Sequence, residues 1–139
     1  MSLAYAESRT ALHEVHEALG RYFDALHHSD TTALTTIFHP GAVYATATEG
    51  TLVRLSMDEY LAIVAARESP ASRGEGRTDA IESVEFAGPV TALARVQCSI
   101  GPKRFTDLLT FVRVDGRWQI IAKVFHFEPE PAPLVAGGV

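Results

Sequence analysis

One carboxylate occupies an otherwise apolar strand face. Asp107 stands between Phe105 and Leu109 at alternate positions, and alternate residues of a β-strand share a face. Desolvating an ionised carboxylate among such neighbours costs several kcal/mol unless it is paired. We therefore expect Asp107 either to have a partner or to serve in acid–base chemistry. The structural alternative is an ion pair or hydrogen bond that only stabilises the strand.

Two side chains that can carry positive charge, Lys123 and His126, are the candidate partners of Asp107. If Asp115-Gly116 forms a two-residue turn, Asp107 shares a face with Val124 opposite and with His126 on the diagonal. An Asp–His pair of this kind can shuttle protons. If the turn is a three-residue loop with a bulge, Asp107 faces Lys123 and forms a salt bridge. The residues alone leave both registers open.

Three more side chains can take part in binding or catalysis. Tyr22 lies on the apolar stripe of the first predicted helix, where its hydroxyl can donate to a carbonyl or a developing oxyanion. Tyr60 offers the same chemistry from the third predicted helix, and His39 follows a short helix in a Phe-His-Pro sequence. The structural alternative makes the tyrosines core aromatics and the histidine a capping or surface residue.

Other kinds of site are not indicated. His13, His16 and Glu17 lack the H-E-x-x-H spacing of a zinc site, so no metal is expected. We find neither a G-x-S-x-G elbow nor a phosphate-binding glycine loop, and expect no cofactor. The single cysteine, Cys98, argues against a disulfide framework and favours a reducing, cytoplasmic setting.

The composition indicates one globular domain. The chain has 139 residues, of which 47% are hydrophobic, and a net charge of -5, which argues against disorder. Without a cluster of basic residues, we expect no nucleic-acid partner. No apolar run approaches the ~18–20 residues of a membrane helix, and the first residues do not resemble a signal peptide, so no membrane partner is expected.

The first half of the chain predicts three helices. Apolar residues recur at helical spacing over 12–26. Asp30 is a candidate N-cap for a short helix to about residue 38. Ser56 and Glu59 fit a capping box that begins a third helix, which runs to about residue 67 and is followed by a loop. Residues 42–55 contain short β-favouring pieces.

The second half predicts four antiparallel strands. Runs rich in β-branched and aromatic residues are separated by Gly-Pro, Gly-Pro and Asp-Gly turns, which are typical of sequential hairpins. Helices followed by such a meander favour an α+β fold with the helices on one face of the sheet. The predicted strands are 81–87, 90–100, 103–114 and 117–127.

The third of these strands is apolar on both faces. Leu108, Val112 and Val114 lie opposite the face that holds Asp107. A sheet covered on one side alternates apolar and polar residues, so a second cover is expected here. The simplest cover is another subunit, which predicts a homodimer through the outer sheet face.

This order of elements resembles the nuclear transport factor 2-like superfamily, over roughly residues 8 to 128. FTDLL at 105–109, DGRWQI at 115–120 and Lys123 before two aromatics are most similar to its putative lumazine-binding family. The resemblance implies a cone-like curved antiparallel sheet wrapped around the three helices, with an apolar pocket open at one end. The whole chain, 1–139, would be one such domain, with the N-terminal residues and the tail 129–139 extended or frayed. The resemblance also favours the pairing of Asp107 with Lys123.

Two functions are compatible with this resemblance. The first, which we favour, is a binding domain that holds a small apolar or aromatic ligand in the cone. The alternative is an isomerase, cyclase or dehydratase acting on a small carbonyl compound, with Asp107 or His126 as base and Tyr22 or Lys123 as electrostatic stabiliser. The expected ligand-binding residues are Tyr22, Phe23, Phe38, His39, Tyr44, Tyr60, Phe111, Trp118 and Lys123.

Overall fold

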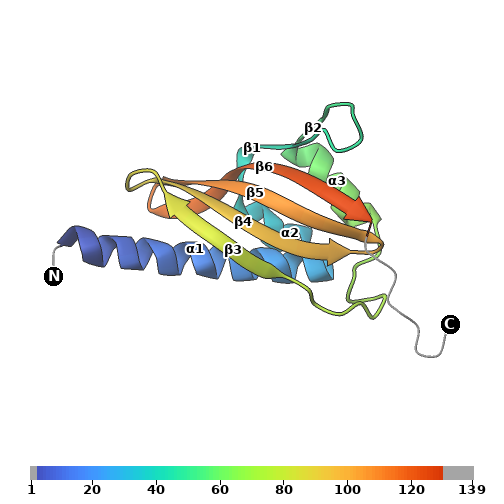
Figure 1. Ribbon diagram of the computed structural model, residues 1–139, viewed down its shortest axis with the longest axis horizontal. Coiled ribbons are helices and arrows are strands. Elements are labelled where there is room, and N and C mark those ends of the chain that lie inside the picture. The colour runs from blue at the N-terminus through green and yellow to red at the C-terminus, as the bar shows by residue number, and fades with distance from the viewer. Residues whose placement is uncertain (1–2, 130–139) are drawn as a thin grey trace.

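Three helices pack against one side of a curved, six-stranded sheet (Figure 1). The structure is a computed structural model and describes residues 3–129. The α+β fold predicted from the sequence is confirmed. The predicted tail lies outside the described residues beyond Pro129, which ends the last strand.

The second and third helices begin where their local capping signals place them, while the first begins earlier than the sequence predicts. Helix α1 spans Leu3–His28, so the segment predicted to be frayed is helical from Leu3 onward. Helix α2 spans Thr31–Ile37, and the Asp30 carboxylate accepts a hydrogen bond from the Ala33 amide at 3.0 Å. Helix α3 spans Met57–Ala66 and begins with the predicted capping box of Ser56 and Glu59.

The sheet is mixed, with one parallel pair among antiparallel neighbours. Its spatial order is β2-β1-β6-β5-β4-β3, and β1 runs parallel to β6. The wholly antiparallel sheet expected from the hairpin turns is therefore wrong at this one junction. The strands of the meander alternate in direction, and its last strand, β6, runs in the same direction as β1, which comes from the first half of the chain. The strands are β1 (Phe38–Thr46), β2 (Val53–Ser56), β3 (Ala80–Phe86), β4 (Thr91–Ile100), β5 (Lys103–Val114) and β6 (Arg117–Pro129).

The β5–β6 hairpin contains a bulge within β6, whereas the sequence offered a bulge only at the turn itself. Asp115-Gly116 is a two-residue turn, and both residues have positive φ angles of 51° and 76°, as a type I′ turn requires. Farther along, Phe111 pairs with Ile120 but Thr110 pairs with Ala122. One extra residue on β6 thus shifts the register and reverses which side chains face inward.

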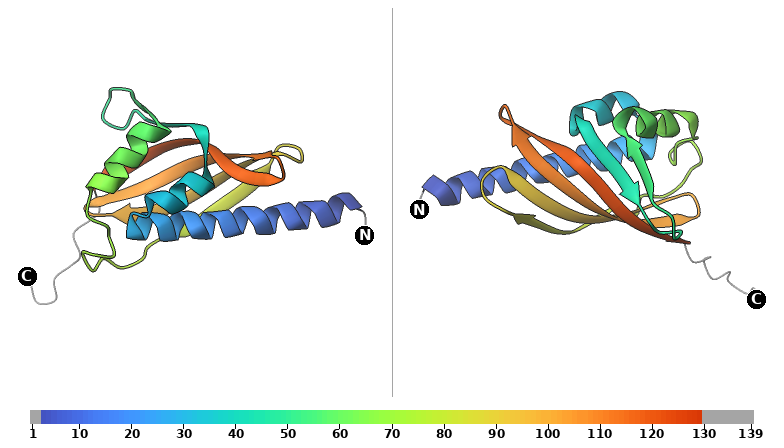
Figure 2. Two further views of the ribbon diagram at one scale, coloured as in Figure 1. Left: turned by 180° about the vertical axis from the view of Figure 1, so that it is seen from behind. Right: turned by 90° about the horizontal axis from the view of Figure 1, so that it is seen from above.

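The bulge decides the partner of Asp107. Beyond the bulge, Lys123 lies opposite Leu109 and Phe125 opposite Asp107, so these four side chains share the inner face. His126 pairs with Thr106 on the outer face. The inner face curves around α1, as Figure 2 shows from two directions. The largest fully buried side chains of the core include Tyr22, Tyr60, Phe38, Phe111, Leu19 and Leu34.

Candidate functional site

Asp107 lies at the centre of a buried polar cluster inside the curved sheet. Its side chain is 0% exposed. Its Oδ2 accepts a hydrogen bond from the Tyr22 hydroxyl at 2.7 Å and lies 3.9 Å from Lys123 Nζ. The structure therefore places Asp107 beside Lys123, the pairing that the resemblance favoured. Helix α1 brings Tyr22 to this point, because its apolar stripe packs against the inner face.

Lys123 is enclosed by aromatic rings as well as by Asp107. Its ammonium lies 5.1–5.7 Å from the ring centroids of Tyr22, Tyr44, Tyr60 and Phe125, within the range of cation–π attraction. Burial by itself lowers the pKa of Lys123, but the Asp107 carboxylate and the nearby tyrosine oxygens outweigh it, and the pKa is raised. Lys123 is consequently a protonated, buried cation at neutral pH.

Two hydrogen-bonding positions of the cluster remain open. Asp107 Oδ1 is buried and has no hydrogen-bond partner among the described residues. The Tyr60 hydroxyl oxygen accepts a hydrogen bond from Lys123 Nζ at 3.3 Å, and no described residue accepts the proton of that hydroxyl. Burial, then Asp107, raise the pKa of Tyr22, so Tyr22 stays a neutral donor. The cluster thus combines one free acceptor with one free donor that is polarised by a cation.

Tyr44 forms the partly exposed wall of the cluster. It pairs with Lys123 across the parallel β1–β6 junction. Its ring stacks on Tyr60 at 4.7 Å between centroids and contacts Phe125 at the same distance. Burial raises the pKa of Tyr44, while Lys123 lowers it by a smaller amount. Tyr44 is therefore neutral at pH 7, and its partly exposed ring adds an apolar face to the cluster without adding charge.

Two more predicted ligand-binding residues border the cluster. The Phe38 ring lies 6.0 Å from Tyr22 and 5.8 Å from Tyr60, centroid to centroid. Phe23 contacts Tyr22 at 5.7 Å. Phe111 is fully buried opposite Ile120 on the same inner face and belongs to the core. Aromatic side chains thus fill the space beside the polar atoms.

Two of the predicted ligand-binding residues lie elsewhere in the fold. Trp118 contacts Phe86 at 5.7 Å and lines a surface groove with Glu14 of α1, because it stands before the bulge near the β5–β6 turn. His39 accepts a hydrogen bond from the Gly41 amide at 2.9 Å through Nδ1 and so stabilises its own turn. Neither one is a member of the Asp107–Lys123 cluster.

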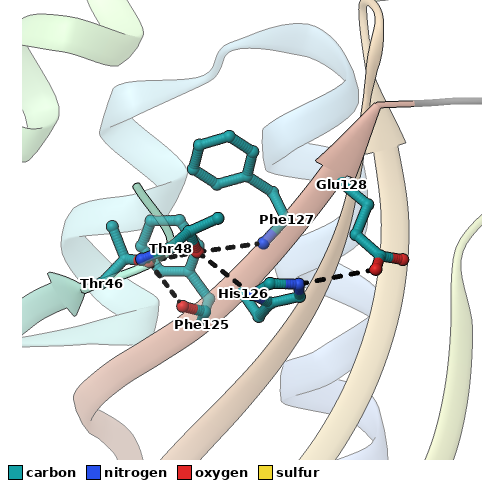
Figure 3. Close-up of polar contacts among 6 residues, drawn as sticks. All are labelled: Thr46, Thr48, Phe125, His126, Phe127 and Glu128. Carbon is teal, nitrogen blue, oxygen red and sulfur yellow. Dashed lines mark hydrogen bonds and ion pairs between the residues drawn. The ribbon is translucent and has the colours of Figure 1, made fainter. Parts of the chain in front are cut away.

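His126 faces away from Asp107, so of the two pairings that the sequence left open, the Asp107–His126 pair does not form. Its side chain is 61% exposed, with Nε2 3.7 Å from Glu128 and Nδ1 3.4 Å from the Thr48 hydroxyl (Figure 3). Thr46 donates to the Phe125 carbonyl at 2.7 Å and joins the end of β1 to β6. The bulge is the cause, since it turns Lys123 inward and His126 outward.

One end of the curved sheet is closed by residues 67–79, which connect α3 to β3. The Ala71 amide donates to the His27 carbonyl at 2.9 Å, and Arg77 contacts Asp24 at 2.9 Å, so this closing segment is fastened to the end of α1. A cavity of about 20 Å³ lies beneath it, lined by Phe23 and Cys98 among others. That volume accommodates about one water molecule. Burial raises the pKa of Cys98 to about 12, so its thiol is not a nucleophile at neutral pH.

Residues 3–129 contain neither a helix suited to crossing a membrane nor a group of three or more His, Cys, Asp and Glu side chains placed to hold a metal. Sequence reasoning missed Phe125, which contacts Lys123 and Tyr44, and Arg67, which ends the helix that carries Tyr60. The alternation of Phe125 with Phe127, out of phase with Trp118 and Ile120, was a visible signal for the first. Arg67 carried no such signal, because its environment depends on how α3 packs.

Comparison with known proteins gives a consistent picture of the fold. The model of a family described as Putative lumazine-binding matches residues 10–126. An NTF2-like protein of unknown function from Silicibacter pomeroyi is 26% identical, with a TM-score of 0.78 over 87% of this chain and 98% of that one. A ketosteroid isomerase-like protein from Erwinia carotovora atroseptica is 15% identical, with a TM-score of 0.66 over 84% and 95% of the two chains.

A curated relative matches over a shorter stretch. The aldolase FrzH of Cladobotryum sp. is 40% identical over 43 residues, which are 30% of this chain and 34% of that protein. The chain therefore spans about a third of the curated relative it matches. The structural neighbours, by contrast, extend over most of the chain and bear out the NTF2-like fold with its cystatin-like arrangement.

Proposed function

The chain belongs to the Putative lumazine-binding family, and we propose that it is a small-molecule-binding domain whose ligand reaches the Asp107–Lys123 cluster. The observation that carries this proposal is the unpartnered Asp107 Oδ1, buried in an aromatic surround. A buried acceptor without a donor is unfavourable by about 1–3 kcal/mol, so a ligand that supplies the donor gains affinity from it.

The open atoms favour a hydroxyl group on a planar, apolar ligand. A phenol or enol hydroxyl can donate to Asp107 Oδ1 and at the same time accept from the Tyr60 hydroxyl, which Lys123 polarises. The rings of Tyr44 and Phe125 offer apolar faces for the rest of the ligand. Entry requires the aromatic side chains or the closing segment to move, since the cavity at that end is small.

Methyl 4-hydroxybenzoate should bind the protein in isothermal titration calorimetry, and Asp107→Asn should weaken the binding about 10–100-fold. The expected loss corresponds to one hydrogen bond to a charged group, about 1.5–3 kcal/mol. Tyr60→Phe tests the donor separately and should weaken binding less. Methyl 4-methoxybenzoate is the matched control ligand, because it cannot donate to Asp107. If it binds as tightly as the phenol, the proposal is wrong.

A second candidate function uses the same two open positions for catalysis. Asp107 Oδ1 can accept a proton from the carbon next to a carbonyl, while the electron pair moves onto the carbonyl oxygen. The Tyr60 hydroxyl, supported by Lys123, would stabilise the resulting enolate. The names of the aldolase relative and of the ketosteroid isomerase-like neighbour are compatible with enolate chemistry. This candidate is favoured because one cluster, lined by aromatic side chains, holds both a base and an electrophile.

The outer sheet face supports a proposed homodimer. Leu108 and Val124 pair directly on it and are 40% and 47% exposed, and Val114 is 44% exposed. Size-exclusion chromatography with light scattering at micromolar concentration should give about twice 15.1 kDa. Val124→Asp should shift the mass to that of the monomer, because it places a carboxylate in the apolar contact. A wild-type protein that is monomeric under these conditions would contradict the proposal.

We also propose a cytoplasmic setting, which the single buried thiol of Cys98 supports. The partners proposed are thus a small apolar or aromatic ligand and a second copy of the chain. The net charge of -5 gives no support for nucleic-acid binding.

A further inference from the structure

One edge of the Arg67 guanidinium is buried and forms no hydrogen bond within residues 3–129. The residue caps the C-terminus of α3 and begins the closing segment. Its Nε and Nη2 atoms are buried, and neither has a hydrogen-bond partner among the described residues. These two nitrogens share one edge of the planar guanidinium, and their N–H bonds point outward from that edge in parallel. This is the edge that receives both oxygens of a carboxylate in a bidentate pair.

Arg67 follows the buried face of α3 that carries Tyr60 and Val64, since these residues precede it by seven and three positions. Burial raises the pKa of Tyr44, while Lys123 and then Arg67 lower it. Burial likewise raises the pKa of Cys98, and Arg67 is again among the groups that oppose the rise. Tyr44 stacks on Tyr60 at one side of the cluster, and Cys98 lines the small cavity under the closing segment. Arg67 therefore lies at the end of the α3 face that contributes Tyr60 to the cluster, and its charge acts on Tyr44 and Cys98.

The charges in this region do not cancel. Asp107 compensates Lys123, which leaves the guanidinium of Arg67 as a surplus positive charge. The other carboxylate that acts on Cys98 belongs to Asp79, and Arg77 holds it at 2.6 Å. The guanidinium stays charged although its Nε and Nη2 atoms have lost their hydration, so an anion that pairs with this edge would be strongly favoured.

We propose that the ligand is a carboxylic acid, whose carboxylate binds the Nε–Nη2 edge of Arg67 while its hydroxyl binds Asp107. The proposal rests on the proposed binding function and narrows it to hydroxy-substituted aromatic or enolic carboxylates. Two charge-assisted contacts at two ends of the ligand would fix its orientation in an otherwise apolar site. The surplus charge would then be neutralised only in the complex.

Matched acids and esters test the proposal without any knowledge of the natural ligand. The probes are 3- and 4-hydroxybenzoate and their methyl esters, titrated calorimetrically into the full chain at pH 7.5. Each pair shares the ring and the hydroxyl and differs in the negative charge. The wild-type protein should bind at least one acid 10-fold or more tightly than its ester. Arg67→Gln should remove this preference, weakening the acid at least 10-fold and changing the ester less than 2-fold.

Two control variants define the other outcomes. Arg113→Gln removes an exposed arginine that lines the distant groove beside Trp118 and should leave both affinities unchanged. Arg67→Lys keeps the charge but not the bidentate edge, so it should retain only part of the preference for the acid. This variant also provides the test if Arg67→Gln folds poorly. Equal binding of acid and ester would overturn the carboxylate proposal and leave the binding function standing. Failure of the esters as well as the acids would overturn both.

Discussion

Lys123→Met should lower the free energy of unfolding by about 3–5 kcal/mol, as expected when one member of a buried ion pair is removed. Methionine retains an unbranched apolar side chain among the aromatic rings but leaves the Asp107 carboxylate buried without a cation. Guanidinium unfolding followed by circular dichroism measures the change. Asp107→Asn, which keeps the shape and removes the opposite charge, should cost about 1–3 kcal/mol.

The double variant Asp107→Leu/Lys123→Met separates the charge effect from packing. Since both charges are then absent, it should recover most of the loss that Lys123→Met causes alone. Lys103→Met is the matched control, because Lys103 is exposed on β5 and only its contact with the Phe127 ring is lost. That change should stay within about 1 kcal/mol of the wild type. A loss under 1 kcal/mol for Lys123→Met would contradict a buried, functioning ion pair.

The stability deficit of Lys123→Met should be the same at pH 6 and pH 9. The pKa of Lys123 is raised in the folded protein, so the stabilisation it provides is fully present below its unfolded pKa of about 10.4. It is lost only as the pH rises through the higher folded value. Tyr22 acts in the same direction, since its pKa is also raised and its hydroxyl stays protonated over this range.

The features that the sequence predicted correctly are those with local causes. Asp30 and the Ser56–Glu59 capping box bond to amides three residues away, so their helices could be placed without any tertiary information. The Asp115-Gly116 turn is local as well, because only residues that tolerate positive φ angles fit there. Each of these elements begins or turns where the sequence predicts.

The features that the sequence missed depend on distant segments. The parallel pairing of β1 with β6 joins residues about 80 positions apart, and no turn signals it. The bulge in β6 has a faint signal, since the apolar phase changes between Ile120 and Phe125. Asp107 could be identified because a lone charge on an apolar face needs a partner, but the choice of Lys123 over His126 needed the observed register. Arg67 became visible only once its buried edge was seen.

The acid–base candidate leads to the other large effect, on proton exchange. In deuterium oxide the protein should accelerate exchange of the C1 protons of 2-tetralone, a small ketone whose C1 enol is conjugated with its benzene ring. Asp107→Asn should lower the enzymatic exchange rate about 10²–10⁴-fold, the contribution usual for a positioned general base. Loss of intensity of the C1 proton signal in NMR spectra gives the rate.

Two further variants assign this exchange to the cluster. Tyr60→Phe removes the donor that faces the enolate oxygen and should lower the rate by about 10–100-fold, a smaller loss than that of the base because Lys123 stays in place. His126→Gln should leave the rate unchanged, since the imidazole lies on the outer face beside Glu128. A rate that falls with His126→Gln but not with Asp107→Asn would place the chemistry outside this cluster. No exchange above the buffer rate, together with tight binding of the phenol probe, would mean that the open donor and acceptor bind a ligand without catalysing proton transfer.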